Sequence, residues 1–433
     1  MNGSPEPPFG NYFVSTYPPF SCWKEAALDD FRDQLERVPA APPPLGLYAH
    51  VPFCVDRCQY CYYLSHDHEL SAMGAYLEAL LKELGQYARA PALAGRRLDF
   101  VYFGGGTPSL FGPALLERLL EGVQALFPFD AAREVTFECA PRTVTSNKLR
   151  LLRDAGVTRL SLGAQQLNDE VLRMNGRVHL SADVERAYAW AREVGFDTIN
   201  LDLIAGLVGE TEQSFASSLE RVLELLPDSV TIYQLEIPLN TPLYRSIQDG
   251  SVPAAPPDWE TKRARVRGAF ARLEASGYTV RSSCAAVRDP DRHPFLYQDV
   301  QYLGADLLGV GCSAFSSLDG FNQQNLASLP AYFDAVQRGE LPLWRGYRLN
   351  DDERMVREFI LQLKLGSADR GHFRERYGLD PAERFKDALE ACARAGWLRV
   401  ADEAIEVTRE GLLRIDRLLP GFYLEPHRNV RYS

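Results

Sequence analysis

Three of the eight cysteines lie close together in the sequence, at a spacing that is typical of metal ligation. Cys54, Cys58 and Cys61 form the pattern C-x3-C-x2-C, with no fourth cysteine nearby. Iron–sulfur clusters are normally held by four cysteine thiolates, so a set of three is informative. Three thiolates on one loop can hold three irons of a [4Fe–4S] cube and leave the fourth iron open to another ligand. We therefore predict a cluster of this kind at these cysteines.

A zinc site is the alternative for the same loop. A structural zinc ion takes four protein ligands in a tetrahedron, and His50, His66 or His68 would complete the set. Spacings of three and then two residues are uncommon for zinc, so the spacing alone favours iron.

The composition is that of an ordinary globular protein. The chain has 433 residues, of which 46% are hydrophobic and 24% charged. Its net charge of −11 argues against a nucleic-acid partner, because such binding depends on clustered Lys and Arg. No stretch reaches the roughly 18 apolar residues of a membrane span, and the N-terminus lacks a signal-peptide pattern. We expect a cytoplasmic protein that binds no membrane, whose clustered thiols are reduced and serve as metal ligands.

The other five cysteines are scattered singly along the chain. A lone free cysteine usually behaves as a small buried hydrophobic residue. We expect this of Cys22, Cys139, Cys284, Cys312 and Cys392.

The elements that must position the cysteine loop alternate between strands and helices. Short apolar runs rich in β-branched and aromatic residues begin at positions 45, 98, 134, 159, 198 and 229, and helical patterns follow the first five. In the segment 181–196, for example, Val184, Ala187, Tyr188, Ala191 and Val194 share one helix face. This alternation predicts a parallel sheet built from right-handed crossovers. Six units are too few for a closed barrel, so we expect an open or partial (β/α)6 barrel.

Polar residues leave these strands at the edge where the cysteine loop begins. The second run ends in "YFGGGTPS", where Gly104, Gly105 and Gly106 allow close approach of backbone to a ligand. The same triplet also fits a tight turn between strand and helix. The later runs end near Glu138, Gln165, Asp202 and Glu236. Because parallel strands bring their carboxyl ends to one rim, we expect a polar ligand pocket there.

Two proline-rich stretches, 37–46 and 251–260, divide the chain. One amphipathic helix is expected over 258–277, and helical patterns dominate from about residue 330. We therefore expect four parts: an N-terminal segment (1–45), the partial barrel (46–257), a barrel extension (258–329) and a smaller, mainly helical C-terminal domain (330–433).

These motifs resemble the radical S-adenosylmethionine (SAM) superfamily. The resemblance rests on C-x3-C-x2-C with Tyr60 before the last cysteine, followed by GGGTP. Within the superfamily the chain is similar to the oxygen-independent coproporphyrinogen III oxidase group. Four blocks support this: "LYAHVPFC", "VYFGGGTPSL", "GVTRLSLGAQQLNDEVLRMNGR" and "INLDLIAGLVGET". The similarity runs from about 45 to 420, and "NYFVSTYPPF" at 11–20 resembles the segment that folds over the active site in the oxidase.

The resemblance implies that Cys54, Cys58 and Cys61 ligate a [4Fe–4S] cluster whose open iron is chelated by SAM. Reductive cleavage of SAM would then give a 5′-deoxyadenosyl radical. Cofactor contacts are implied for Tyr48, Gly105 and Glu138 at a first SAM, and for Tyr60, Gly106, Thr107, Gln165, Arg177, Asp202 and Glu236 at a second. Gly104 is also expected to contact the cofactor. Tyr48 and Glu138 are also expected to act in catalysis. By charge, Arg177 suits a methionine carboxylate, and Asp202 suits a ribose or ammonium group.

The reaction expected from the resemblance is transfer of a methyl or methylene group from the second SAM to an sp² carbon of a small molecule. The oxidase carries a further cysteine where this chain has Tyr63, and this departure favours methyltransferase or cyclopropanase relatives. Oxidative decarboxylation of a coproporphyrinogen is the alternative. A haem chaperone is the second, but its H-N-x-x-Y-W stretch is matched here only by "HPFLYQ" from His293. The resemblance further implies a flavodoxin- or ferredoxin-type electron donor and a monomer.

Overall fold

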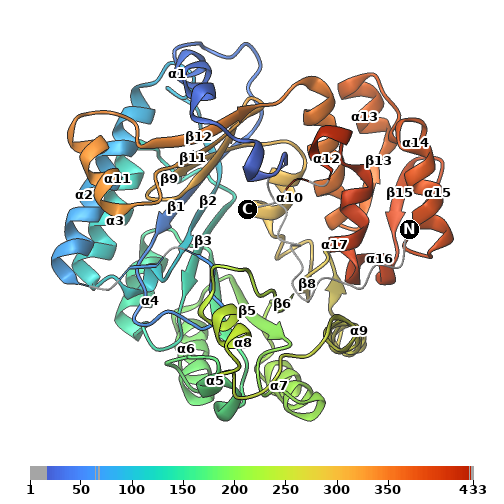
Figure 1. Cartoon of the computed structure of the whole chain (residues 1–433). Helices are drawn as coiled ribbons and strands as arrows, with labels where there is room; N and C mark the ends of the chain where they lie inside the picture. Colours follow the sequence, from blue (N-terminus) through green and yellow to red (C-terminus); the bar gives the residue numbers. More distant parts are fainter. Residues whose placement is uncertain (1–16, 64, 67–68, 429, 431–433) are drawn as a thin grey trace.

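The computed structural model describes residues 17–63, 65–66, 69–428 and 430. Its main body is a 12-stranded sheet in the order β12-β11-β10-β9-β1-β2-β3-β4-β5-β6-β8-β7 (Figure 1). Six neighbouring strands are parallel and follow chain order: β1 (Leu45–Val51), β2 (Leu98–Gly105), β3 (Glu134–Cys139), β4 (Arg159–Gln165), β5 (Thr198–Ala205) and β6 (Ser229–Gln234). The predicted partial barrel of six βα units is confirmed.

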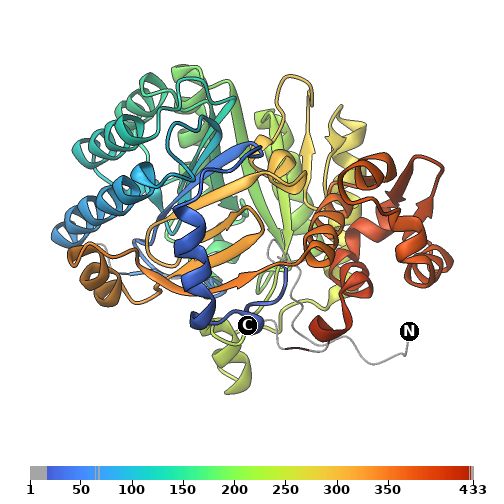
Figure 2. The ribbon, with the colours of Figure 1, turned by 90° about the horizontal axis from the view of Figure 1, so that it is seen from above.

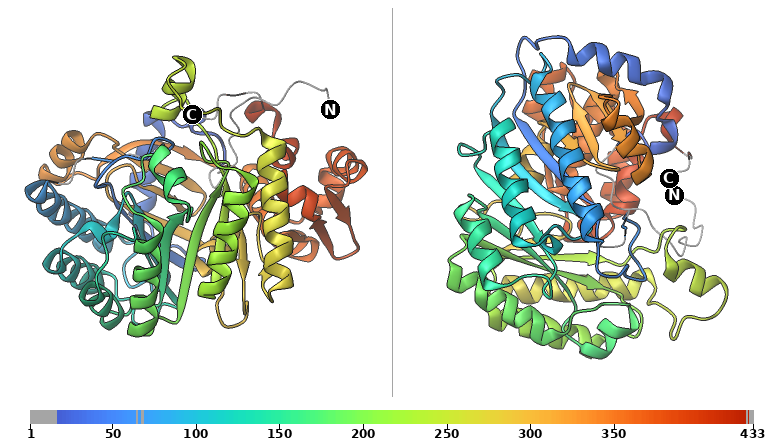
Figure 3. Two further views of the ribbon diagram at one scale, coloured as in Figure 1. Left: turned by 90° about the horizontal axis from the view of Figure 1, so that it is seen from below. Right: turned by 90° about the vertical axis from the view of Figure 1, so that its left-hand side faces the viewer.

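Helices connect these strands and lie along one side of the sheet (Figure 3). The main ones are α2 (Leu70–Arg89), α3 (Pro113–Leu126), α4 (Ser146–Asp154), α6 (Ser181–Val194) and α7 (Glu212–Leu225). The predicted face of α6 is confirmed, since Val184, Ala187, Tyr188 and Ala191 are buried and Val194 is partly buried against the same core. Gly195 ends α6 in the left-handed region, at φ 85°, which favours glycine.

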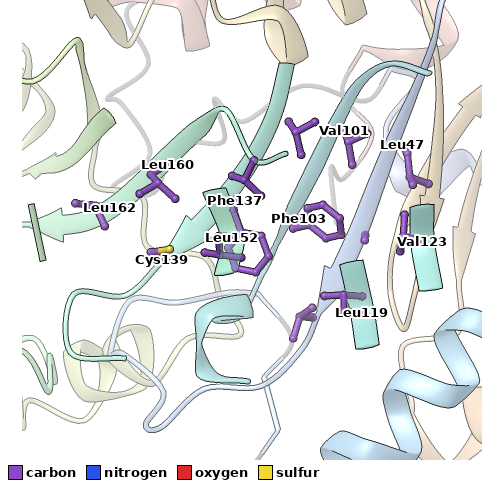
Figure 4. Close-up of a cluster of buried hydrophobic side chains, with 14 of the residues drawn as sticks. Leu47, Val101, Phe103, Leu119, Val123, Phe137, Cys139, Leu152, Leu160 and Leu162 are labelled. Carbon is purple, nitrogen blue, oxygen red and sulfur yellow. The ribbon is translucent and has the colours of Figure 1, made fainter. Parts of the chain in front are cut away.

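The core between strands and helices is apolar on the side shown in Figure 4. Leu47, Phe103 and Phe137 from three neighbouring strands meet Val123 of α3 and Leu152 of α4 in one buried cluster. Strands of a parallel sheet are buried on both faces, so their sequences are nearly continuously apolar and do not alternate between apolar and polar residues.

Three of the five single cysteines are buried as predicted: Cys139, Cys312 and Cys392. Cys22 and Cys284 differ from the prediction, because both are only partly buried.

The sheet continues beyond the six predicted units at both ends. β9 (Asp306–Val310) pairs with β1 in parallel, and three antiparallel strands follow: β10 (Phe315–Leu318), β11 (Phe321–Asn325) and β12 (Leu343–Arg348). At the other end, β8 (Ala285–Val287) and β7 (Thr279–Val280) continue from β6. Helix α1 (Leu28–Leu35) packs on β11 and β12, α10 (Leu296–Tyr302) contacts β2, and α11 (Leu329–Gln337) packs against α2.

The C-terminal helices form a second body with its own core, beside the sheet in Figures 1 and 2. α12 (Asp351–Lys364) reaches from β12, where Tyr347 donates to Glu353 at 2.6 Å, to the segment before β8, where Ser283 N donates to the Lys364 carbonyl at 2.9 Å. A small sheet of β13 (Ser367–Asp369), β15 (Ala404–Val407) and β14 (Leu398–Val400) lies against it.

The remaining helices are α5 (Asp169–Met174), α8 (Pro242–Gln248), α9 (Trp259–Ala275), α13 (Arg370–Tyr377), α14 (Pro381–Arg384), α15 (Lys386–Arg394), α16 (Arg409–Leu413) and α17 (Ile415–Leu418). The helix expected over 258–277 is α9. β12 falls within 330–433 but pairs with β11 of the large sheet, so this part of the chain is shared between the two bodies. Within the described residues, no helix has the length and apolarity that a membrane crossing needs.

Candidate active site

The cysteine loop leaves the carboxyl end of β1, the buried central strand. Cys54, Cys58 and Cys61 are all partly buried on a loop without regular structure, and Cys61 N closes a turn on the Cys58 carbonyl at 3.1 Å. The Arg57 guanidinium donates to the Cys61 carbonyl at 3.2 and 3.0 Å. Burial raises the pKa of the Cys61 thiol to about 12, so a thiolate there requires a cation against it, as iron would provide.

The glycine loop at the end of β2 packs directly against the cysteine loop. A Cβ on Gly106 would lie 2.7 Å from the Phe53 carbonyl oxygen, and Gly106 N donates to the Val51 carbonyl at 2.8 Å. The Thr107 hydroxyl contacts Cys54 Sγ at 3.5 Å. Glycine is therefore required here for close approach of one loop to the other, in addition to any ligand.

The residues predicted for the first SAM lie together in one connected group. Tyr102 donates to Glu138 Oε1 at 2.7 Å, and Gly105 N donates to Glu138 Oε2 at 3.0 Å. Tyr48 hydrogen-bonds His50 Nδ1 at 3.0 Å, and a Cβ on Gly105 would lie 2.7 Å from the His50 ring. Burial raises the pKa of Glu138 to about 7, partly opposed by the Tyr102 hydrogen bond. This carboxyl group changes charge near neutral pH.

His50 was one of the candidate fourth ligands for zinc. Burial lowers the pKa of His50 to about 4, and its Nε2 has no hydrogen-bond partner among the described residues. His66 pairs through its backbone with Pro52, at 2.8 Å, next to the cysteine loop. His68 lies outside the described residues. No three Cys, His, Asp or Glu side chains in the described ranges surround a single point as one metal ion would require.

Arg177 is the central residue of the group predicted for a second SAM. It follows α5 and donates from Nη1 to Cys58 Sγ at 3.0 Å and from Nη2 to the Gly163 carbonyl at 3.0 Å. A Cβ on Gly163 would lie 2.9 Å from Gln165 Nε2 and 3.8 Å from Arg177 Nη2, so these two side chains are neighbours. Gln165 has φ 63°, a value that is strained for any residue other than glycine. It lies where the pairing register between β4 and β5 shifts.

Three buried polar atoms in this area lack a hydrogen-bond partner in the described part of the chain. They are the Tyr60 hydroxyl, Gln165 Oε1 and Arg177 Nε. Buried polar groups in proteins are normally satisfied, so unpaired atoms beside three thiols indicate a polar ligand. The donor set fits an iron–sulfur cube, because its three thiolates bind three different irons and need not meet at one point.

Asp202 and Glu236 are placed differently from the expectation. Asp202 lies within β5, which continues to Ala205, and its oxygens accept from Ser161 at 3.0 Å and Asn200 at 2.8 Å. Burial raises the pKa of Asp202 to about 6. Glu236 is 5% exposed and lies two residues beyond the end of β6. Asp202 interacts electrostatically with Glu138, so the two groups share one interior.

Sequence reasoning missed two aromatic side chains beside the predicted Tyr48, namely Tyr102 and Tyr297. Tyr297 of α10 reaches Tyr102, with ring centres 4.3 Å apart, and Tyr48 stacks on Tyr102 at 5.9 Å. Tyr62 and Tyr63 stack at 4.5 Å beside the cysteine loop. The alternation of side chains along β2 could have identified Tyr102 as facing the interior, whereas nothing in the sequence around Tyr297 indicates where it folds.

Comparison with known proteins identifies the family of this chain. A model of the radical SAM superfamily matches residues 48–222, and a model of the HemN C-terminal domain matches 349–414. The oxygen-independent coproporphyrinogen III oxidase of Escherichia coli is 32% identical over 409 residues, covering 89% of this chain and 88% of that protein. The chain belongs to the oxygen-independent coproporphyrinogen III oxidase family. The solved structure of coproporphyrinogen III oxidase (HemN) from E. coli matches with TM-score 0.82 and 30% identity, over 95% of this chain and 96% of that one.

Membership of this oxidase family makes the protein a radical SAM enzyme, with a [4Fe–4S] cluster and SAM as cofactors. The superfamily match begins at residue 48, so it includes the cysteine loop and the glycine loop. The family also includes a relative of another kind: the haem chaperone HemW of Bacillus subtilis is 28% identical over 372 residues, covering 84% of this chain and 96% of that protein.

Proposed function

We propose that the protein oxidatively decarboxylates propionate side chains of a coproporphyrinogen-type tetrapyrrole. The main support is that the likeness to the oxidase extends over 89% of the chain, through barrel and C-terminal domain, and not only over the SAM-binding part. Fold alone would not indicate substrate, because one fold supports many reactions. The expectation of methyl or methylene transfer receives no support from the relatives reported above, which are oxidases and a haem chaperone.

In this proposal the protein's own residues hold the cofactors and exclude water. The three cysteines hold the cluster, which together with SAM supplies the 5′-deoxyadenosyl radical. Tyr48, Gly105 and Glu138 contact the first SAM, while Arg177 and Gln165 contact a second. Burial of the connected carboxyl and tyrosine groups keeps water from the reacting carbon. A flavodoxin- or ferredoxin-type protein delivers the electron.

The test is anaerobic turnover of coproporphyrinogen III by the reconstituted holoenzyme with SAM and dithionite. We expect loss of CO2 from the tetrapyrrole, seen by mass spectrometry, together with 5′-deoxyadenosine. The matched control is Cys61→Ala, which should give neither product. Formation of 5′-deoxyadenosine by the wild type with no change in the tetrapyrrole would contradict the proposal.

A second candidate is transfer of a methyl or methylene group to an sp² carbon, and Tyr63 is the observation that favours it. Tyr63 stands where the oxidase carries a further cysteine, and its ring stacks on Tyr62 with the two hydroxyls 3.3 Å apart. The two functions separate with methyl-labelled SAM. Label in the tetrapyrrole would indicate carbon transfer, and loss of CO2 without label would indicate decarboxylation.

The haem-chaperone alternative is disfavoured by His293. Its side chain is 4% exposed, with Nδ1 2.9 Å from the Thr198 hydroxyl and Nε2 3.6 Å from Asp228. This histidine lies in a loop and is buried against the start of β5 and the residue before β6. A histidine held in this way is not available to haem iron. When haemin is added anaerobically, the wild type and His293→Ala should therefore give the same Soret band.

A further inference from the structure

Arg345 lies on the face of β12 that points toward the N-terminal segment. In the sheet, Phe315, Gln324 and Arg345 are cross-strand neighbours on β10, β11 and β12. Arg345 Nε donates to Gln324 Oε1 at 2.8 Å, and Nη1 donates to the Phe20 carbonyl at 3.4 Å. Its guanidinium lies 5.2 Å from the Phe20 ring and 4.2 Å from the Trp344 ring. The side chain is thus held in one orientation.

Arg345 has no anionic partner in the described part of the chain. Burial lowers the pKa of Arg345, and no carboxylate charge opposes this effect. Two other partly buried arginines have a carboxylate partner: Arg96 pairs with Asp306 at 2.8 Å and Arg265 with Glu210 at 2.6 Å. A cation withdrawn from water without a counter-charge is unfavourable. The guanidinium is fixed and half-buried, and its two acceptors, the Gln324 amide and the Phe20 carbonyl, are neutral. It can therefore still bind an anion.

A line of contacts connects Arg345 to the cysteine loop. Gln324 Nε2 donates to the Ser313 hydroxyl at 3.2 Å. Ser313 has φ 65°, an unfavourable conformation that non-glycine residues adopt mainly where the surroundings impose it. Two residues before it, a Cβ on Gly311 would lie 2.7 Å from the His50 carbonyl oxygen at the end of β1. Ser313, Gln324 and Arg345 thus continue the rim on which the cysteines lie.

We propose that Arg345, with Gln324 and Ser313, binds a carboxylate of the substrate. The proposal rests on the decarboxylase function above and adds where the substrate is anchored. Guanidinium binds carboxylate through two parallel hydrogen bonds, and the Phe20 and Trp344 rings would fix its plane. The ligand class is a planar polycarboxylate, whose charge the protein's net −11 would otherwise repel.

The anchored carboxylate is a spectator in the reaction. β12 is four strands from β1 in the sheet order, which is roughly 19 Å along a flat sheet at about 4.8 Å per strand. A substrate held at Arg345 therefore presents a different side chain to the cluster. Loss of Arg345 should weaken binding and leave the chemical step largely intact.

The test is equilibrium binding of coproporphyrin III, the stable oxidised tetracarboxylate, to the holoenzyme, followed by fluorescence. Arg345→Met removes the charge at similar length, and Arg345→Lys keeps it without the planar fork. The matched control is Arg348→Met on the opposite face of β12, where the guanidinium lies 4.9 Å from the Phe321 ring. The tetraamide of the same porphyrin serves as the uncharged ligand.

We expect Arg345→Met to weaken coproporphyrin binding about tenfold to a hundredfold, the range for a hydrogen bond to a charged group. The affinity of Arg345→Lys for coproporphyrin should lie between those of Arg345→Met and the wild type. All proteins should bind the tetraamide equally well. In turnover, Arg345→Met should have a higher KM for coproporphyrinogen than the wild type, whereas its kcat should stay within about twofold of the wild-type value. Equal loss in Arg348→Met, or unchanged binding in Arg345→Met, would overturn the anchor while wild-type decarboxylation still stood. Absence of both binding and decarboxylation in the wild type would overturn the proposed function itself.

Discussion

Glu138→Gln tests the charge of the carboxyl group that connects the residues predicted to contact the first SAM. The carboxylate accepts from Tyr102 at 2.7 Å and from Gly105 N at 3.0 Å. A glutamine can keep both contacts, because its carbonyl oxygen accepts from Gly105 while its amide donates to the Tyr102 hydroxyl, which rotates to accept. The variant therefore retains shape and local hydrogen bonds and loses only the negative charge.

The structure sets the size and the pH dependence of the effect. A hydrogen bond to an ionised acceptor contributes about 1.5–3 kcal/mol, so the variant should bind SAM about tenfold to a hundredfold more weakly at pH 8. Burial raises the pKa of Glu138 to about 7, so at pH 6 only about a tenth of the wild type is ionised. The advantage of the wild type should therefore shrink about tenfold from pH 8 to pH 6.

Folding stability should respond in the opposite direction. The pKa of Glu138 is raised from 4.5 to about 7 in the folded protein, so the protonated form is favoured there. The stabilising contribution is complete below pH 4.5 and is lost as pH rises through 7. The loss amounts to about 3 kcal/mol at most. Between pH 5 and pH 8 the wild type should lose more thermal stability than Glu138→Gln.

The assay is SAM binding to the anaerobically reconstituted holoenzyme by isothermal titration, at pH 6, 7 and 8. Titration of SAM itself cancels in the ratio of variant to wild type. Tyr102→Phe is the matched control: it keeps an ionisable carboxyl at position 138 but removes a hydrogen bond that lowers the pKa of Glu138, so its SAM binding should still depend on pH. Iron content is measured for all three proteins. A ratio that stays constant from pH 6 to pH 8, or a variant that binds as tightly as the wild type, would refute the reasoning.

Three further predictions concern the cluster and its surroundings. Reconstituted protein should bind about four irons per chain, and replacing Cys54, Cys58 and Cys61 with Ala should remove both iron and visible absorbance; stoichiometric zinc in protein purified without air would contradict this. Gly105→Val should lower thermal stability as well as SAM binding, because a Cβ there would lie 2.7 Å from a buried histidine ring, and normal melting with normal SAM cleavage would count against it. Arg177→Ala should abolish product while uncoupled 5′-deoxyadenosine continues, measured by chromatography, and loss of the iron instead would show that its contact to a cysteine sulfur dominates.

The six parallel strands and the helices between them could be predicted from the sequence. The strands near 45, 98, 134, 159, 198 and 229 and the helices between them follow from apolar runs and helical periodicity. The extension did not follow, because β9 joins β1 across more than 250 residues and its run "DLLGV" is short and glycine-containing. Pairing partners depend on register and tertiary packing, which periodicity does not encode.

The site divides in the same way. Cys54, Gly105 and Glu138 lie at ends of predicted strands, and topology alone brings such ends to one rim. Asp202 was displaced from a strand end to a strand interior, because the apolar run continues past it to Ala205 without a breaker. Arg345 could not be found from sequence, since its significance is the absence of a carboxylate near it in the described structure, and that depends on every neighbouring element.

The tyrosines around the site make substrate anchoring necessary for selectivity. Tyr102 is buried and Tyr48, Tyr60, Tyr62 and Tyr297 are partly buried near the cysteine loop. Withdrawal from water raises the pKa of each above its ordinary value, which keeps the phenols protonated. A phenol O–H bond is weaker than an alkyl C–H bond, so a radical able to attack a side-chain carbon would attack these hydroxyls more readily if they were equally near. Selectivity must then come from position, since a correctly held reactant gains several orders of magnitude in effective concentration. A carboxylate fixed four strands from the cluster restricts the substrate about a distant point, so that the reacting carbon, and no hydroxyl, lies next to the site of radical formation.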